Sequence, residues 1–274
     1  MPLLLSFTSL ATAACTAEPK MIESDIAQRV LEGIAHGKGS FDHSKFDAIL
    51  RQYAKPDRHQ FDYAALKPHQ ADLETYLHQV AQANISALSR DELLALLVNA
   101  YNAYTIESIL KTMTPDRPLG VASILDIPGV FDIKTHMVGG TALSLNSIEH
   151  DILRPIFKDP RIHFAVNCAS FSCPPLSDSA YTGGKVDEQL EAAARRALQS
   201  PDYVRIENGR LLVTKVLEWY GSDFVTPGYR GATGSLAEFI NRYATKEVRQ
   251  FIAARGGKTP VEFMTYNWSL NRVR

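Results

Sequence analysis

The segment from residue 89 to residue 110 constrains the fold more than any other part of the chain. Ser89 is followed three residues later by Glu92, which is the spacing of a capping box at the start of a helix. The helix would then run through LLALLVNAYNAYTIESIL, which is apolar nearly all round. A helix that is apolar on every face must be covered on every face, so we expect it to be central and buried. The 274 residues of the chain are enough to enclose it in a large core.

Helical and hairpin patterns alternate on both sides of this segment. Gly139-Gly140 and Asn208-Gly209 each separate two apolar runs, as hairpin turns do. Apolar spacing predicts further helices at 20–36, 42–53, 72–83, 186–198, 236–243 and 247–254, and strands at 161–169 and 261–268. These patterns predict an α+β fold, in which helices pack on a mainly antiparallel sheet around the long buried central helix.

The chain divides into a leader at 1–19 and a single α+β domain at 20–274. Within the domain we expect an N-terminal helical part, a central part, and a C-terminal part of helices and a strand, at 20–88, 89–225 and 226–274. The net charge of -1 and the pI of about 6.7 show no excess of positive charge, which binding to nucleic acid or an anionic membrane would favour. We expect no membrane span after the leader, and the sequence leaves the oligomeric state open.

The N-terminus resembles a signal peptide. An apolar run from Leu3 to Leu10 leads into small residues at 11–14, where two overlapping sites fit a signal peptidase. We therefore expect an exported, periplasmic protein. Cys15 directly follows two alanines, which makes a lipid anchor at Cys15 a further prediction.

The cysteines Cys168 and Cys173 remain after the leader, and two interpretations of them stay open. An oxidising compartment favours a disulfide between them across the short intervening loop. Alternatively, Cys168 is a nucleophile, which requires a base or a lowered pKa. A disulfide would remove the nucleophile, so the two interpretations exclude each other in one redox state.

His150 is the base that the sequence favours for Cys168. All eight histidines precede Cys168, so a His-then-Cys order is the only one available. Glu149 would orient the imidazole of His150. His163 stands five residues before Cys168 on the predicted strand, and an odd separation places the two on opposite faces. The predicted catalytic residues are therefore Cys168, His150 and Glu149.

Further polar residues accompany this set. Asn99 and Asn102 lie three apart on one face of the buried helix, where they either bridge neighbouring backbone or line a pocket. His150 and Arg154 share a face of a later helix. No HExxH or CxxC motif is present, so we predict no metal and no cofactor. The candidate ligand-binding residues are Asn99, Asn102, Tyr101, Arg154 and Ser170.

Several long motifs occur in an order that points to one family. They are VNAYNAYTI (98–106), SLNSIEHDILR (144–154), PRIHFAVNCASFSCPPL (160–176), Tyr181 with DEQLEAAAR (187–195), and YNWSLN (266–271). In these motifs the chain resembles the domain of unknown function 547 family. The resemblance covers roughly residues 90–225 and the C-terminal motif, and it implies no activity, because the family has none assigned.

Two functions follow as hypotheses. The buried helix followed by antiparallel strands is similar to papain-like and transglutaminase-like thiol enzymes, although there the nucleophile opens the buried helix. By this analogy the protein is an enzyme of thiol-dependent acyl transfer or amide hydrolysis, with Asn99 or Asn102 binding the substrate. The alternative is a non-catalytic module, in which His150, Arg154 and Asn102 bind a small anionic or peptide ligand beside a structural Cys168–Cys173 disulfide.

Overall fold

The long helix α5 (Arg90–Lys111) lies at the centre of the structure. The computed structural model describes residues 24–256 and 259–273. Ser89 Oγ accepts the N–H of Glu92 at 3.4 Å, and every residue from Leu93 to Ile106 is buried. The predicted central helix is thereby confirmed. Among the described helices, α5 alone has the length and hydropathy of a membrane span, and 94% of that stretch is buried inside the protein.

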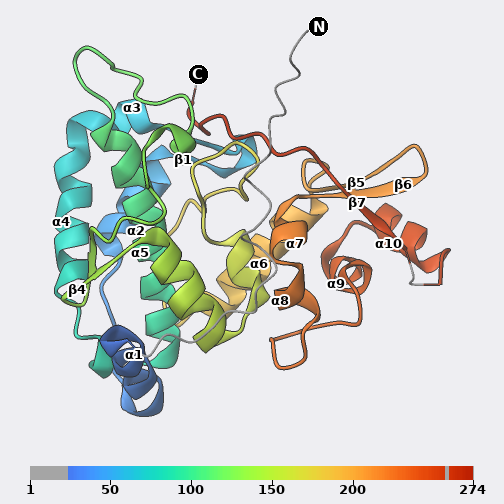
Figure 1. Ribbon diagram of the computed structural model, residues 1–274, viewed down its shortest axis with the longest axis horizontal. Helices are drawn as coiled ribbons and strands as arrows, with labels where there is room; N and C mark the ends of the chain where they lie inside the picture. Colours follow the sequence, from blue (N-terminus) through green and yellow to red (C-terminus); the bar gives the residue numbers. More distant parts are fainter. Residues whose placement is uncertain (1–23, 257–258, 274) are drawn as a thin grey trace, which may run out of the picture.

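The helices of the N-terminal half pack around α5. Figure 1 shows them together on the left of the molecule, where α4 lies along α5 and α1 crosses its end. The predicted helices in this half are confirmed, with residues 20–23 of the first lying outside the described residues. The elements are α1 (Asp25–His36), α2 (Ser44–Tyr53), α3 (Tyr63–Leu66), α4 (Gln70–Ala81) and the 3-10 helices η1 (Pro56–Arg58), η2 (Lys67–His69), η3 (Ile85–Ala87) and η4 (Ile124–Asp126).

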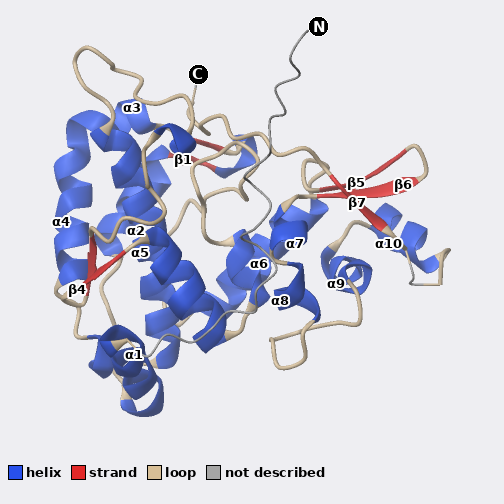
Figure 2. Ribbon diagram, viewed as in Figure 1, coloured by secondary structure: helices blue, strands red, loops and turns tan. Residues whose placement is uncertain are grey.

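The described strands form three small sheets instead of one large one (Figure 2). Their pairing is antiparallel except where the last strand joins its neighbour in parallel. The α+β class with a long buried helix is therefore confirmed. The sheets are β1 (Ala54–Lys55) with β2 (Gln60–Phe61), β3 (His136–Val138) with β4 (Thr141–Leu143), and β5 (Val204–Glu207) with β6 (Arg210–Val213) and β7 (Val261–Phe263).

A second hydrophobic cluster organises the C-terminal part. Phe164, Phe224 and Phe239 are buried in it and contact one another in sequence, and Val204, Leu211 and Val213 of the sheet of β5, β6 and β7 belong to the same cluster. Figure 1 shows this part on the right, separated by α6 from the helices around α5. Its helices are α6 (Val186–Gln199), α7 (Val216–Trp219), α8 (Gly221–Val225), α9 (Leu236–Tyr243) and α10 (Lys246–Ala253).

The strand predicted at 161–169 is wrong. Residues Pro160–Phe164 form the 3-10 helix η6, because the Asp159 side chain accepts the N–H of Arg161 at 3.1 Å and Pro160 occupies the first helical position. The chain then enters the cysteine loop without regular structure. The alternation of faces that separated His163 from Cys168 therefore does not apply. The strand predicted at 261–268 is also too long, because β7 ends at Phe263.

The C-terminal segment 266–272 connects the two halves. It leaves β7 and returns across the molecule to the N-terminal helices, as the red trace in Figure 1 shows. Single β-bridges join Ser269 to Ser123, Leu270 to Ser170 and Arg272 to Phe61. One segment therefore contacts the N-terminal half, the loop after α5 and the cysteine loop.

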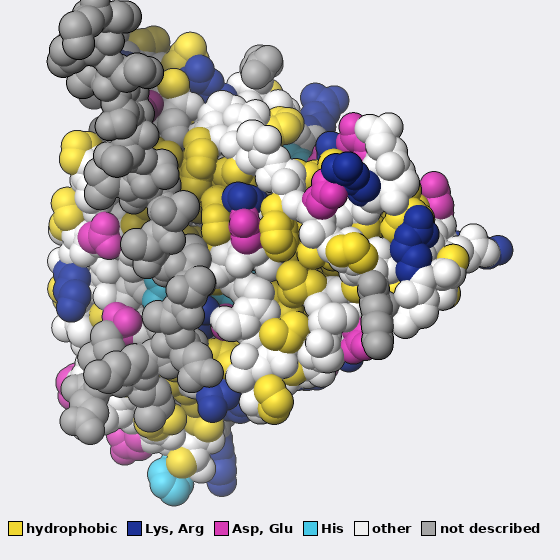
Figure 3. Space-filling view, turned by 45° about the vertical axis from the view of Figure 1, so that its right-hand side comes forward, with side chains coloured by type: hydrophobic (Ala, Val, Ile, Leu, Met, Phe, Trp, Pro, Cys, Tyr) yellow, Lys and Arg dark blue, Asp and Glu magenta, His cyan; other side chains and the backbone are white. Residues whose placement is uncertain are grey.

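The surface carries both signs of charge in a mixed pattern. On the part of the face in Figure 3 that the grey atoms leave uncovered, Lys and Arg side chains alternate with Asp and Glu. This mixture agrees with the net charge of -1. That face therefore offers no large field of one sign to a highly charged partner.

Candidate functional site

The cysteine loop, residues 167–173, is shaped by Asn167. Its backbone N–H donates to Asn102 Oδ1 at 2.8 Å, and its side chain donates to Pro174 O at 2.7 Å and accepts the N–H of Ala169 at 2.8 Å. Ala169 has φ of +62° and is fully buried. A non-glycine residue in this region is strained, so the surrounding hydrogen bonds must hold it there.

The C-terminal segment covers this loop. Two backbone hydrogen bonds join the segments. The N–H of Asn271 donates to Ala169 O at 2.9 Å, and the N–H of Phe171 donates to Ser269 O at 2.8 Å. Tyr266 Oη lies 2.6 Å from Ser170 Oγ and 3.3 Å from Cys168 Sγ. The YNWSLN motif is therefore part of the site, although about a hundred residues separate it from the cysteines.

Both cysteines are free thiols in the structure. Their Sγ atoms lie 3.1 Å apart, well beyond the ~2.05 Å of a disulfide bond. The backbone N–H of Cys168 also donates to Cys173 Sγ at 3.0 Å. The predicted disulfide is not formed here, and it stays a prediction for an oxidised state of the protein.

Hydrogen bonds favour the thiolate of Cys168. The hydrogen bond with the neighbouring Cys173 thiol contributes most to lowering the pKa of Cys168, and burial opposes it. Hydrogen bonds with Ser170 and Tyr266 lower it further, so the pKa of Cys168 is about 7. Burial and the nearby Cys168 raise the pKa of Cys173 well above its ordinary value. The pair therefore contains one thiol that ionises near neutral pH and one that stays protonated.

A cavity of about 570 Å³ opens beside Cys168. Cys168, Cys173, Glu149 and His163 contribute polar groups to its wall, and Lys215 and Glu218 form an ion pair that also borders it. Most of the remaining wall is aromatic, which is typical of a small-molecule site. The aromatic lining residues are Tyr101, Phe131, Trp219, Tyr220, Tyr266 and Trp268.

Glu149 reaches the cavity from the helix η5 (Ser147–Phe157), which has the wide turns of a π-helix. The helix contains Pro155, which lacks the N–H that a regular helical ladder would use. Ser144 Oγ accepts the N–H of Ser147 at 3.0 Å, so Ser144 caps this segment, and the side chain of Asn146 makes no capping bond. Glu149 lines the cavity and is not used to cap the helix.

A buried ionic network supports His163. Arg154 binds Asp223 through two hydrogen bonds, from Nε at 2.7 Å and from Nη2 at 2.9 Å. His163 Nε2 lies 2.8 Å from Asp223 Oδ2. Burial alone would raise the pKa of Asp223, but the hydrogen bonds from His163 and Arg154 hold it well below its usual range. An ionised Asp223 accepts the Nε2–H of His163, so a neutral imidazole would turn the lone pair of Nδ1 away from Asp223.

Two buried polar atoms of residues that line the cavity lie close to each other. Glu149 Oε1 and His163 Nδ1 are 3.6 Å apart, which is an ion-pair distance and too long for a hydrogen bond, and neither atom has a hydrogen-bond partner. Burial would raise the pKa of Glu149, but the charge of His150, the proximity of His163 and the Tyr220 hydroxyl outweigh it and bring the pKa to about 2. Glu149 is therefore a buried carboxylate at neutral pH.

The structure separates the predicted catalytic residues. Cys168 and Glu149 line the cavity, but His150 is not in its lining, and His150 Nδ1 lies 3.1 Å from Arg154 Nη1. His163, which the sequence placed away from Cys168, lines the cavity instead. Asp223 was not identified from the sequence, because nothing near it along the chain marks a site.

The predicted ligand-binding residues have different positions. Asn99 bridges backbone, donating to Tyr181 O at 2.7 Å and accepting the N–H of Tyr181 at 3.0 Å. Asn102 donates to Ala165 O at 3.0 Å and fixes the cysteine loop. Tyr101 lines the cavity, whereas Arg154 and Ser170 contact lining residues from behind. Their direct contact with a ligand stays a prediction.

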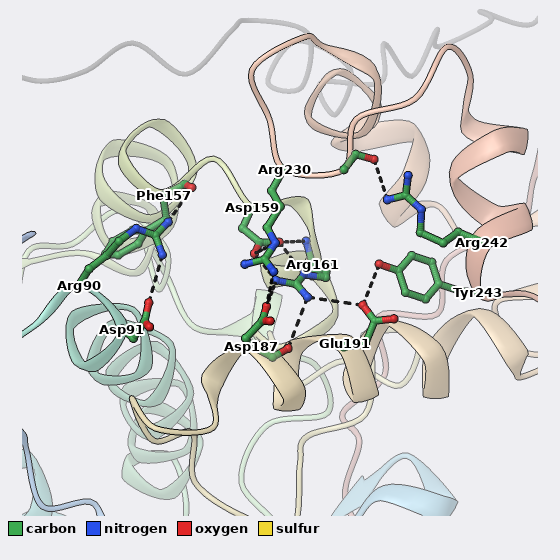
Figure 4. A network of polar contacts seen from close by, with 11 residues as sticks. Arg90, Asp91, Phe157, Asp159, Arg161, Asp187, Glu191, Arg230, Arg242 and Tyr243 are labelled. Atoms are coloured by element: carbon green, nitrogen blue, oxygen red, sulfur yellow. Dashed lines mark hydrogen bonds and ion pairs between the residues drawn. The ribbon is translucent and has the colours of Figure 1, made fainter.

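A second polar network holds η6 in place from outside the cavity (Figure 4). Arg161 binds Asp159 on its own helix and Asp187 on α6, at 2.6 and 2.7 Å, and Arg230 also reaches Asp187 at 2.7 Å. These bonds connect α6 to the element that carries His163. Within residues 24–256 and 259–273, no group of three or more His, Cys, Asp or Glu side chains is arranged to hold a metal ion.

The fold and the site thus define an α+β protein with an aromatic cavity beside a pair of thiols. Residues 85–197 match the family model described as "Protein of unknown function, DUF547", which confirms the predicted resemblance over this part of the chain. No curated protein and no solved structure matches the chain. The likeness to papain-like and transglutaminase-like enzymes therefore stays a prediction. The matched region contains Glu149, His163 and Cys168, but Asp223 and Tyr266 lie beyond it.

Proposed function

We propose that the protein catalyses thiol-dependent acyl transfer or amide hydrolysis, with Cys168 as the nucleophile. The observation that carries the proposal is the position of Cys168 in the cavity wall, with a thiol, a serine hydroxyl and a tyrosine hydroxyl within hydrogen-bond distance of its sulfur. These groups lower the pKa of Cys168 to about 7, so a large fraction of the thiol is ionised at neutral pH.

The reaction would proceed in two steps. The Cys168 thiolate attacks a carbonyl carbon, a C–S bond forms, and the C–N bond of the substrate breaks as the leaving amine takes up a proton. Water or a second amine then attacks the thioester, the C–S bond breaks, and the thiolate is regenerated. Hydrolysis and transfer differ only in which of these nucleophiles enters the cavity.

His163 is our proposed proton donor and acceptor, in place of His150. It lines the same cavity as Cys168, and the hydrogen bond to Asp223 fixes its orientation, as the third member of a catalytic triad does. His150 is turned toward Arg154, which would compete with a catalytic proton for Nδ1. Cys173 is the proposed hydrogen-bond donor that keeps Cys168 reactive.

The test is activity on a panel of cell-wall and γ-glutamyl amides and the corresponding thioesters. Wild-type protein should release amine or thiol, Cys168→Ser should lose this activity, and His163→Ala should reduce it on amides more than on thioesters, because a thiolate leaves without a proton. His150→Ala is the matched control and should retain most of the activity. Turnover that survives in Cys168→Ser would exclude the proposal.

The non-catalytic module remains the second candidate, because the Sγ atoms of Cys168 and Cys173 are already 3.1 Å apart. Oxidation would join them with little movement and remove the nucleophile. Mass spectrometry of the protein purified without reductant distinguishes the two. A stoichiometric disulfide together with ligand-induced thermal stabilisation and no turnover would favour binding.

We further propose that the protein is exported. The predicted leader at 1–19 and the predicted lipid anchor at Cys15 lie outside the described residues. Cell fractionation and the mass of the mature N-terminus test both. An unprocessed N-terminus in the cytoplasmic fraction would contradict export, and a mature protein without added lipid would contradict the anchor.

A further inference from the structure

The Glu149 carboxylate is a buried negative charge that the protein leaves incompletely paired. The residue is 4% exposed and lines the cavity, and its buried Oε1 atom has no hydrogen-bond partner. An ionised carboxylate in a buried position is costly unless a cation or hydrogen-bond donors compensate it. His163 Nδ1, at 3.6 Å from Oε1, is likewise without a hydrogen-bond partner. A group carrying N–H donors would satisfy both atoms together.

The other charges near the cavity already have partners. Arg154 is held by two hydrogen bonds to Asp223, and Lys215 forms an ion pair with Glu218. The groups that act on Glu149 itself are the imidazoles of His150 and His163, the hydroxyl of Tyr220 and the charge of Arg154. Arg154 also acts on Glu149 through its charge, but its hydrogen bonds go to Asp223, so Oε1 of Glu149 keeps no hydrogen-bond partner.

Much of the wall of the same cavity is aromatic. Trp219 and Trp268 stack with ring centroids 5.6 Å apart, and Tyr266 packs against both at 4.7 and 4.6 Å. All three rings line the cavity. The faces of tryptophan and tyrosine rings attract cations, so the wall and the carboxylate favour the same kind of ligand.

We infer that the cavity binds the protonated amino group of its ligand, with the ammonium donating to Glu149 Oε1 and the adjoining carbon chain lying against Trp219, Tyr266 and Trp268. The inference rests on the proposed function for its reaction, to which it adds the substrate class: an acyl compound or acceptor that carries a primary ammonium group. Binding itself does not depend on the thiol, so the two are tested separately.

Tryptophan fluorescence reports on this site directly, because the chain has two tryptophans and both line the cavity. The experiment titrates Cys168→Ser protein at pH 7 with phenethylamine, which is protonated, and with the neutral 2-phenylethanol and the anionic phenylacetate. Hydrogen bonds to a charged group favour the amine, which should bind about tenfold or more tightly than the alcohol, with the acid weakest. Equal or tighter binding of the alcohol would overturn the inference.

Glu149→Gln identifies the carboxylate responsible, and Glu218→Gln is the matched control. The first should remove the preference for the amine over the alcohol, whereas the second should keep it, because Glu218 is already paired with Lys215. A preference that survives in Glu149→Gln would overturn the assignment. If circular dichroism shows that Glu149→Gln does not fold, the ratio of amine to alcohol binding in the Cys168→Ser protein decides. Amine binding without turnover in the wild type would exclude the proposed function alone.

Discussion

The groups that surround the sulfur of Cys168 lower the pKa of its thiol. Cys173, Ser170 and Tyr266 are each within hydrogen-bond distance and together offset the effect of burial. A free cysteine at the end of an apolar run would have the opposite character, since burial raises a thiol pKa. The local hydrogen bonds therefore decide whether this residue is a nucleophile or an inert core side chain.

We predict that removing one donor raises the pKa of Cys168. In wild-type protein, the rate of alkylation by iodoacetamide should rise with pH through a midpoint of about 7. Tyr266→Phe and Cys173→Ser each remove a group that stabilises the thiolate, so the midpoint should move to higher pH, and more for Cys173→Ser. Tyr243→Phe removes a hydroxyl that binds Glu191 at 3.1 Å outside the cavity and should leave the midpoint unchanged.

Ala169 provides a second prediction at this scale. At φ of +62° a β-branched side chain is strained, and the position is fully buried, so Ala169→Val should lower the free energy of unfolding by about 2 kcal/mol or more. Ala169→Gly relieves the strain but adds freedom to the unfolded chain, so its net effect should be small. Urea unfolding followed by circular dichroism measures both. Equal stability of the valine and glycine variants would show that the loop does not constrain this residue.

Among the elements, η5 and η6 determine the polar side of the cavity. The wide turns of η5 place Glu149 toward the cavity and Arg154 toward Asp223, and η6 brings His163 between the two carboxylates. Hydrophobic spacing predicts a helix at η5 but not its wide turns, and it predicts a strand where η6 forms. The position of His163 depends on Pro160 and Asp159 at the start of η6 and on the Arg161 network that ties it to α6.

The buried carboxylates make stability depend on pH. The pKa of Glu149 falls from 4.5 to about 2 on folding, and that of Asp223 is also lowered. A lowered pKa stabilises the folded state above the unfolded value and loses this contribution as pH falls through the folded value. We therefore expect the thermal midpoint to decline between about pH 4.5 and 2. Glu149→Gln should flatten part of this decline, and an identical profile for the variant would contradict the assignment.

At the scale of the whole molecule, the site is assembled from parts that are far apart in the chain. The thiols come from the loop after η6, the carboxylates from η5 and α8, and the aromatic wall from α5, α7 and the C-terminal segment. The segment 266–272 holds the assembly together through its bridges to three other regions. The cavity therefore exists only when the two halves of the fold are joined.

Ending the chain after Thr265 should test this connection. The shortened protein loses Tyr266, Trp268 and the hydrogen bonds of Asn271 to the cysteine loop and to Tyr63. We expect a lower midpoint in urea and loss of the selective reactivity of Cys168 toward iodoacetamide. Arg272→Ala, which removes only an exposed bond to Leu119 O at 3.0 Å, should behave as the wild type. Unchanged stability of the shortened chain would show that the segment does not stabilise the fold.

The sequence by itself determined the elements whose signals are local. The capping box and all-round apolar pattern of α5 and the glycines of the two hairpin turns depend on neighbouring residues alone, and the structure agrees with them. Family motifs likewise marked the cysteine loop and the C-terminal segment before either had a place in space. These features give the α+β class and some of the residues that line the cavity, such as Tyr101, Cys168 and Tyr266.

Tertiary structure alone decided which polar residues meet. His163, not His150, lines the cavity, and the aspartate cap and proline that start η6 replace the expected strand, so its alternation of faces does not apply. Asn99 and Asn102 became backbone bridges because their partners, Tyr181 and Ala165, are supplied by distant segments. The state of Cys168 depends on a tyrosine near the end of the chain. Long-range contacts of this kind produce no periodic pattern in the sequence, because the side chains that form them are close in space but not at a regular spacing along the chain.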